Sequence, residues 1–197
     1  RLSGLAVPQL VVGSNTNDVL TRFFTEGTMG ITEVVPTTSP SMDIQVSSNL
    51  ERLLFEINGR DGAAVGAQLD DFRATGTFRL DPVQHASLAS GWAGARFNDD
   101  AVRACIADEA VRSGLVLDPH TAVGVLAARA CRRDPLIPMV ALATAHPAKF
   151  PDAVEAATGS RPELPDHLAD LHDRPERLTA LPADVAVIED FVRSHRR

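Results

Sequence analysis

The segment ALATAHPAKFPDAV (141–154) holds side chains that could do chemistry. Lys149 is the only lysine in the chain, so it could be a catalytic amine or simply a solvent-facing residue at a helix start. His146 could transfer protons because the ordinary pKa of histidine lies near neutrality, although a histidine before proline more often hydrogen-bonds the backbone. Thr144 ends the apolar run PLIPMVALAT (135–144), which predicts a central strand of a parallel sheet. Ligands of open α/β sheets bind at the carboxyl ends of strands, so Thr144 is a candidate ligand-binding residue, unless it only caps a turn.

A second group of polar residues lies in the stretch SPSMDIQVSSNLERLLFE (39–56). The pattern predicts a helix that starts near Ser47, and the free N–H groups of its first turn would attract an anion. Arg52 would add bidentate recognition of a phosphate. The alternative is that the serines only cap the helix and the arginine faces solvent. The candidate residues are Ser41, Asp43, Ser47, Ser48, Asn49 and Arg52.

Further polar residues stand at the carboxyl end of the first predicted strand, PQLVVG (8–13), where turn and capping chemistry is the more common role. They are Asn15, Asn17 and Asp18. His120 follows Asp118, which is the predicted N-cap of a helix, and could also carry protons. Neither the other histidines nor the two cysteines, Cys105 and Cys131, have metal-ligand spacing, so no metal site is predicted.

The elements that must position these residues follow from hydrophobic periodicity. Periodicity predicts helices over 17–24, 47–57, 63–75, 82–89, 98–113, 118–133, 150–158 and 183–195, and convincing strands over 8–13 and 135–144 only. Residues 25–46 are predicted to be one long loop. The fold class is therefore α/β, with helix in excess and few parallel strands. A two-stranded parallel sheet is not a plausible independent domain, so we expect the rest of the sheet to lie in a longer parent chain.

Composition and charge disfavour nucleic-acid-binding, membrane-spanning and secreted proteins. The net charge of −7 disfavours a nucleic-acid-binding protein, which would carry a basic face. No apolar run is long enough for a membrane span, and no signal peptide pattern is visible. The cysteines are expected to be buried thiols in a reducing compartment. We therefore expect a soluble cytoplasmic protein with no membrane partner. Oligomeric state cannot be predicted from these observations.

Four blocks of the sequence resemble threonine synthase, a pyridoxal-phosphate (PLP) enzyme of fold type II, and occur in the family's order. They are NTNDVLTRFF (15–24), SPSMDIQVSSNLERLLFE (39–56), LDPHTAVGV (117–125) and ATAHPAKFPDAV (143–154), and the tail TALPADVAVIEDFVR (179–193) is also similar. The resemblance implies conversion of O-phospho-L-homoserine and water to L-threonine and phosphate. It covers only the carboxy-terminal portion of the family, because the FKD-type Schiff-base lysine and the GNFGN-type phosphate loop are absent from residues 1–197.

The resemblance also implies roles for particular residues. Lys149 corresponds to the lysine of the family's AHPAKF block and not to the Schiff-base lysine, so no catalytic residue is expected in this chain. Thr144 is implied to hydrogen-bond the pyridine nitrogen of PLP, where a neutral hydroxyl leaves that nitrogen unprotonated. Residues expected to contact the substrate are Ser41, Asp43, Ser48, Asn49, Arg52 and Lys149. The expected partners are this substrate and the rest of the same enzyme.

Two alternatives remain open at this stage. The chain could be a truncated, non-catalytic α/β module that binds a phosphorylated ligand or a partner chain. It could also belong to another fold type II enzyme, such as a threonine dehydratase, although the SMDIQVSSN (41–49) and TAHPAKF (144–150) blocks favour threonine synthase.

Overall fold

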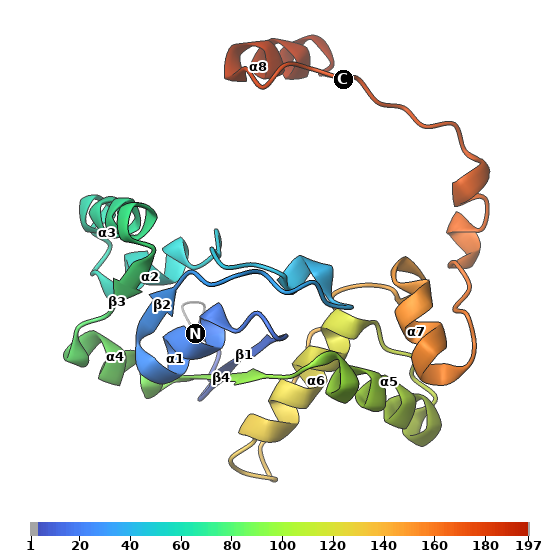
Figure 1. The fold of residues 1–197 in the computed structure, drawn as a ribbon, viewed down its shortest axis with the longest axis horizontal. Helices are drawn as coiled ribbons and strands as arrows, with labels where there is room; N and C mark the ends of the chain where they lie inside the picture. Colours follow the sequence, from blue (N-terminus) through green and yellow to red (C-terminus); the bar gives the residue numbers. More distant parts are fainter. Residues whose placement is uncertain (1–3, 197) are drawn as a thin grey trace. The chain divides into compact units, whose positions relative to one another are not determined.

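The computed structural model describes residues 4–196 and divides into two compact units, residues 1–162 and residues 163–197 (Figure 1). All of the candidate residues lie in the first unit. The second unit contains two short 3-10 turns, η3 (Asp166–Leu168) and η4 (Leu171–Asp173), and the helix α8 (Val185–Ser194). No residue of α8 is buried, so this helix contributes nothing to a core within its own unit.

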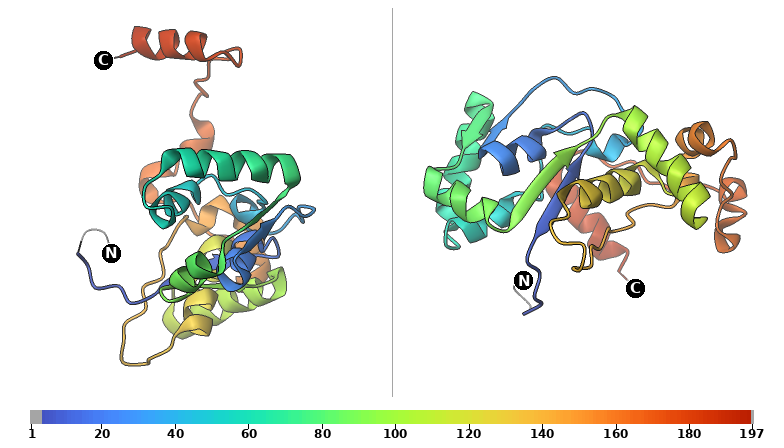
Figure 2. Two further views of the ribbon diagram at one scale, coloured as in Figure 1. Left: turned by 90° about the vertical axis from the view of Figure 1, so that its left-hand side faces the viewer. Right: turned by 90° about the horizontal axis from the view of Figure 1, so that it is seen from below.

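The centre of the first unit is a pair of parallel strands, β1 (Leu10–Ser14) and β4 (Trp92–Arg96), in the register Val12↔Gly94 and Gly13↔Ala95. Successive residues of a strand face opposite sides, so Gly94 and Gly13 face different helices. A Cβ on Gly94 would lie 2.9 Å from the Cα of Thr21 in α1 (Val19–Glu26). A Cβ on Gly13 would lie 2.9 Å from a methyl group of Val123 in α6 (Pro119–Cys131). Glycine thus lets α1 and α6 pack closely on opposite faces of the pair (Figure 2).

One hydrophobic core forms around α1 and involves β2 (Thr28–Gly30), α2 (Glu51–Ile57), α3 (Gly62–Thr75), β3 (Thr77–Arg79) and α4 (Pro82–Ala89). Strands β2 and β3 pair antiparallel. The rings of Phe24 and Trp92 stack at 5.0 Å, which ties α1 to the parallel pair. The largest fully buried side chains of this core include Phe23, Phe72 and Leu54.

A second core lies between α5 (Asp99–Ser113) and α6. Its buried members include Val102, Ile106 and Val123, and Ala157 of α7 (Pro151–Thr158) packs against it. The side chain of Asn98 accepts a hydrogen bond from the backbone N–H of Ala101 and so caps the start of α5. This core holds the start of α6, where the candidate His120 lies, against α5.

The predicted helices are all present, with α2 beginning at Glu51 instead of near Ser47. The strand predicted over 8–13 is β1. The strand predicted over 135–144 is wrong, because this segment is irregular and carries exposed apolar side chains, with Leu136, Val140 and Leu142 exposed by 89, 80 and 75%. Pro135 and Pro138 have no backbone N–H group to donate to a neighbouring strand. Among residues 4–196, no strand pairs with this segment. The sequence also failed to predict β2, β3 and β4, which are short and lack a clear alternation of apolar residues.

The buried carboxylate of Glu109, in α5, is expected to make the stability of the fold depend on pH. Glu109 is 7% exposed and accepts hydrogen bonds from Arg112, at 2.5 Å, and from Arg129. These hydrogen bonds hold the pKa of Glu109 below its usual value, with the bond from Arg112 as the largest cause. A carboxyl whose pKa is lower in the folded state stabilises the fold above its unfolded-state pKa, and this stabilisation is lost as the pH falls through the folded-state pKa.

We therefore expect Glu109→Gln to lower the Tm most near neutral pH, with the difference from wild type narrowing in acid. Thermal unfolding between about pH 7 and about pH 3 measures this difference, since an ordinary glutamate titrates near pH 4.3. Asp70→Asn is the matched control, because Asp70 is 78% exposed and pairs with Arg73 on the surface. A Tm difference for Glu109→Gln that does not change with pH would contradict a lowered pKa for Glu109.

Candidate functional site

A cluster of polar side chains closes the carboxyl end of β1, and Asn15 lies at its centre. Asn15 is fully buried, and its amide nitrogen lies within hydrogen-bond distance of Thr37, Ser39 and Asp43, at 2.7, 3.0 and 2.7 Å. Asn17 adds a reciprocal pair of hydrogen bonds to the backbone N–H and C=O of Val35, both 2.8 Å long. The loop from Val35 to Asp43 is therefore held against the strand end by side chains and not by a sheet ladder.

The carboxylate of Asp43 is a hub of this cluster. Its Oδ1 accepts hydrogen bonds from the amides of Asn15 and Asn17 and from the hydroxyl of Thr37, and its Oδ2 accepts from the backbone N–H of Thr37. This geometry occupies both oxygens and gives Asp43 an architectural role. A substrate contact for Asp43 stays a prediction.

The same loop is held from a second direction by α5. Asp99, in the first turn of α5, accepts from the backbone N–H of Thr38 at 3.1 Å and from its hydroxyl at 3.0 Å. The loop is consequently tied both to the strand end and to the second core.

A second polar cluster occupies the start of α6. Asp118 is the N-cap of this helix and is 1% exposed. It accepts hydrogen bonds from the backbone N–H of His120 and from the Nδ1 of the same residue, both 2.9 Å long. It also accepts from the backbone N–H and the hydroxyl of Thr121.

Hydrogen bonds extend from the Asp118 cluster to two candidate site residues. The Nε2 of His120 accepts from the backbone N–H of Ser41 at 3.2 Å. The hydroxyl oxygen of Thr121 accepts from the backbone N–H of Thr144 at 3.1 Å. Ser41 and Thr144, which lie far apart in the sequence, are therefore joined through one buried carboxylate.

Lys149 lies beside this network. The backbone turns through η2 (Pro147–Lys149), which His146 caps by accepting from the N–H of Ala148 at 3.2 Å. The ring of Phe150 lies 4.5 Å from the ring of His120, and the Nζ of Lys149 stands 5.7 Å from the centre of the Phe150 ring. The structure thus brings Lys149 to the edge of the same site, with its side chain exposed.

Three candidate residues lie elsewhere. Ser48, Asn49 and Arg52 are exposed around the start of α2, where Arg52 donates to the side chain of Asn49 at 3.0 Å. Residues 48–50 form a turn and α2 has no side-chain N-cap, so the helix terminus predicted at Ser47 is not formed there. Among the described residues, no hydrogen bond joins these three to the Asp118 cluster.

Sequence reasoning missed several of the residues that build the site. Thr37, Ser39, Thr38 and Thr121 were not candidates, yet each makes side-chain hydrogen bonds that hold the loop or Thr144. The run TTSPS offered a signal in its density of hydroxyl groups, but nothing in a single sequence reveals that their partners lie on other elements. His120 was considered only as a proton carrier, whereas its ring joins Asp118 to Ser41.

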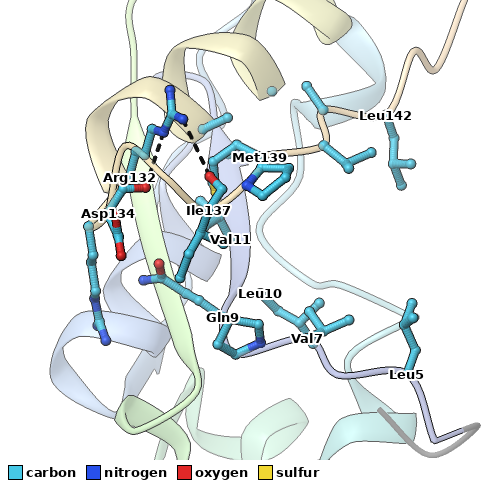
Figure 3. A pocket seen from close by; sticks show the side chains of 18 of the residues that line it. Leu5, Val7, Gln9, Leu10, Val11, Arg132, Asp134, Ile137, Met139 and Leu142 are labelled. Atoms are coloured by element: carbon cyan, nitrogen blue, oxygen red, sulfur yellow. Dashed lines mark hydrogen bonds between the residues drawn. The ribbon is translucent and has the colours of Figure 1, made fainter.

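A cavity of about 770 Å³ lies next to the Asp118 cluster. Its walls are mainly apolar side chains of β1, α6 and the irregular segment after α6, and His120 and Thr144 line it too. Figure 3 shows Met139 and Leu142 along one side of it and Leu10 and Val7 along another. Arg132 also lines it and donates to the backbone carbonyls of Asp134 and Ile137, at 3.3 and 3.4 Å (Figure 3).

Other kinds of site receive no support from the described residues. Between residues 4 and 196, no group of three or more histidines, cysteines and acidic residues is placed to hold a metal ion. Over the same range, no helix combines the length and apolar content needed to cross a bilayer. Burial raises the pKa of the Cys105 and Cys131 thiols, which disfavours their thiolate forms as nucleophiles.

Comparisons with known proteins show what the chain is similar to. Residues 121–192 match the family model described as "Threonine synthase, C-terminal". The chain is 47% identical over 196 residues to a threonine synthase of Pseudomonas aeruginosa, which covers 99% of this chain and 42% of that protein. It superposes with a TM-score of 0.85 and 44% identity on the crystal structure of a PLP-bound threonine synthase from Brucella melitensis, covering 98% of this chain and 42% of that one.

The chain belongs to the threonine synthase family. A yeast threonine synthase structure matches 96% of the chain with a TM-score of 0.79 and 32% identity, so the fold is that of fold type II PLP enzymes. The chain spans only about 42% of the length of each of these relatives. The α/β fold class predicted from the sequence is confirmed.

Proposed function

We propose that residues 1–197 are the carboxy-terminal portion of a threonine synthase, which uses PLP to convert O-phospho-L-homoserine and water to L-threonine and phosphate. The observation that carries this proposal is the match along 98–99% of the chain to enzymes of which it spans 42%. A relative of this kind has been crystallised with PLP bound. The Schiff-base lysine would be supplied by the part of the enzyme outside this chain, and the isolated chain would be inactive.

The environment of Thr144 fits a contact to the cofactor. Its backbone N–H is held by Thr121, while its side chain is exposed next to the cavity. Its hydroxyl hydrogen-bonds to none of the residues that the structure describes, so it is free to meet the ring nitrogen of PLP. When bound, PLP supplies an electron sink for the reaction, and a neutral hydroxyl partner keeps the ring nitrogen unprotonated.

Substrate contacts are assigned on similar grounds. The backbone of Ser41 is anchored by His120, and Lys149 stands at the edge of the same site, where its ammonium group could attract an anionic group of the substrate. Ser48, Asn49 and Arg52 form a separate exposed set that could reach a phosphate once the rest of the enzyme is present. The cytoplasmic location and the absence of a nucleic-acid partner stay predictions from the sequence.

The exposed apolar segment supports the presence of a further part of the enzyme. Leu136, Val140 and Leu142 are almost fully exposed, and β1 has a paired strand on one side only among the described residues. An open strand edge beside the apolar cavity of about 770 Å³ would favour aggregation unless other structure covered it. The alternative, a truncated module that binds a partner chain, would cover the same surface with a different polypeptide.

The intact mass of the denatured polypeptide from its native source separates these two functions. A mass well above the 21.0 kDa of this chain, together with formation of L-threonine from O-phospho-L-homoserine, is expected. A mass of 21.0 kDa would overturn the assignment and favour the truncated module.

Lys149 provides a second test, because it is the only lysine in the chain. Borohydride reduction attaches PLP permanently to the lysine that holds it, and mass spectrometry of the digest locates this lysine. We expect the label outside residues 1–197, and we expect the Lys149→Met variant of the full-length polypeptide to be labelled as fully as wild type. Label on Lys149 would show that the chain carries its own cofactor lysine and would contradict the proposed division of the enzyme.

A further inference from the structure

The hydrogen bonds around Asp118 run in one direction because a carboxylate only accepts. The hydroxyl of Thr121 has a single proton, which it donates to Asp118, so its oxygen can only accept from Thr144. The Nδ1 of His120 donates to Asp118, so the Nε2 of a neutral ring is the acceptor for Ser41. The buried carboxylate of Asp118 therefore fixes which atom donates and which accepts in two series of hydrogen bonds. One series ends at the backbone N–H of Thr144 and the other at the backbone N–H of Ser41.

We propose that Asp118 is a positioning residue of the active site. Through Thr121 it holds the backbone of Thr144, and through His120 it holds the backbone of Ser41, so that both segments keep a fixed distance from the start of α6. The proposal rests on the function proposed above, in which Thr144 meets the cofactor and Ser41 lies near the substrate. Asp118 itself touches neither.

Helix capping alone does not account for these contacts. Asp61 caps α3 by accepting hydrogen bonds from the N–H groups of Ala63 and Ala64, and this is all that an N-cap requires. Asp118 also accepts from two backbone N–H groups, but one at each carboxylate oxygen, and each oxygen accepts in addition from a side chain, that of His120 or of Thr121. The extra two bonds are the ones that continue to Ser41 and Thr144.

Asparagine tests the need for two accepting oxygens, because it can cap a helix through one oxygen about as well as aspartate but carries an amide NH₂ in place of the other. In Asp118→Asn, whichever way the amide is turned, either Thr121 or His120 faces an NH₂ donor where its own proton needs an acceptor. If the NH₂ faces Thr121, the hydroxyl proton of Thr121 must turn toward the N–H of Thr144. If it faces His120, the Nδ1 proton meets another donor. Asp61→Asn makes the same chemical change at a cap whose two hydrogen bonds share one oxygen and which accepts from no side chain among the described residues.

Amide hydrogen exchange of the full-length polypeptide without cofactor tests the positioning role directly. In Asp118→Asn, we expect exchange in peptides covering Ser41 or Thr144 to accelerate by about tenfold, the effect of losing one hydrogen bond. Asp61→Asn should leave both peptides unchanged. Unchanged exchange in Asp118→Asn, or equal acceleration in both variants, would overturn the proposal.

Thr121 keeps the test decisive if Asp118→Asn fails to fold. Thr121→Val removes the hydroxyl at nearly constant shape, and Thr121→Ser restores it. With saturating PLP, we expect Thr121→Val to lower kcat by about tenfold with little change in KM for O-phospho-L-homoserine, and Thr121→Ser to recover most of kcat. Equal kcat for the valine and serine variants would overturn the proposal. Accelerated exchange in a wild-type-like fold that has no synthase activity would retain the positioning role and reject the proposed function.

Discussion

Replacing Asn15 by leucine is expected to release the loop between Val35 and Asp43 and to destabilise the fold by about 3 kcal/mol, because buried polar partners lose their hydrogen bonds. Leucine has nearly the size of asparagine but cannot donate to Ser39 and Asp43 or accept from the backbone N–H of Asn17. The free energy of unfolding in denaturant measures the loss. Limited proteolysis should cut the released loop faster than in wild type.

Thr16→Ala is the matched control for this variant, since Thr16 lies between the two asparagines but is exposed. It should change the free energy of unfolding by less than about 0.5 kcal/mol, as most surface substitutions do. If Asn15→Leu proved as mild as Thr16→Ala, the cluster would not be what holds the loop. Because the loop carries Ser41, Asn15→Leu should also lower synthase activity in the full-length polypeptide.

A methyl group at Gly13 is the second change with a large expected effect. In Gly13→Ala the new Cβ would meet a methyl of Val123 at 2.9 Å and its backbone oxygen at 3.1 Å, so β1 and α6 must move apart. Overpacking of this kind costs about 1–3 kcal/mol. The separation would also disturb the site, since β1 leads into Asn15 and α6 begins with the Asp118 cluster. We expect both the Tm and the synthase activity of the full-length polypeptide to fall.

Gly124→Ala makes the same substitution one residue beyond Val123, where nothing lies within 4 Å of the added Cβ. Alanine is a better helix former than glycine, so this variant should gain about 0.5–1 kcal/mol. The two variants are compared by thermal unfolding under one set of conditions. A Gly13→Ala protein as stable as wild type would mean that the strand and helix can separate at no cost.

The helices were predictable because their signals are local. Asp118 followed by a proline marks the start of α6, and glycines mark the ends of α1, α3, α5 and α7. The strands were harder, because β4 is a five-residue WAGAR segment whose stability comes from stacking and close packing and not from its own composition. The run 135–144 has the composition of a buried strand, but a strand needs neighbours, and this chain supplies none among its described residues.

The site was predictable in part. Thr144, Ser41 and Lys149 were candidates, and the structure brings their segments together. The connection could not be foreseen, because it passes through Thr121 and the ring of His120, whose side-chain partners depend on the tertiary fold. The sequence also did not show that Ser48, Asn49 and Arg52 lie apart from the Asp118 cluster, since α2 begins later than its pattern indicated.

The hydrogen bond between Ser41 and His120 spans 79 residues, and the bond between Thr38 and Asp99 spans 61. Contacts of this sequence separation form slowly, because the entropy of closing the intervening loop opposes them. On a ribosome that adds about 5–20 residues per second, the loop would leave the exit tunnel roughly ten seconds before His120 is available. During this interval the hydroxyl and amide groups of the loop are solvated, so the loop between Val35 and Asp43 stays open on the nascent chain until α6 emerges.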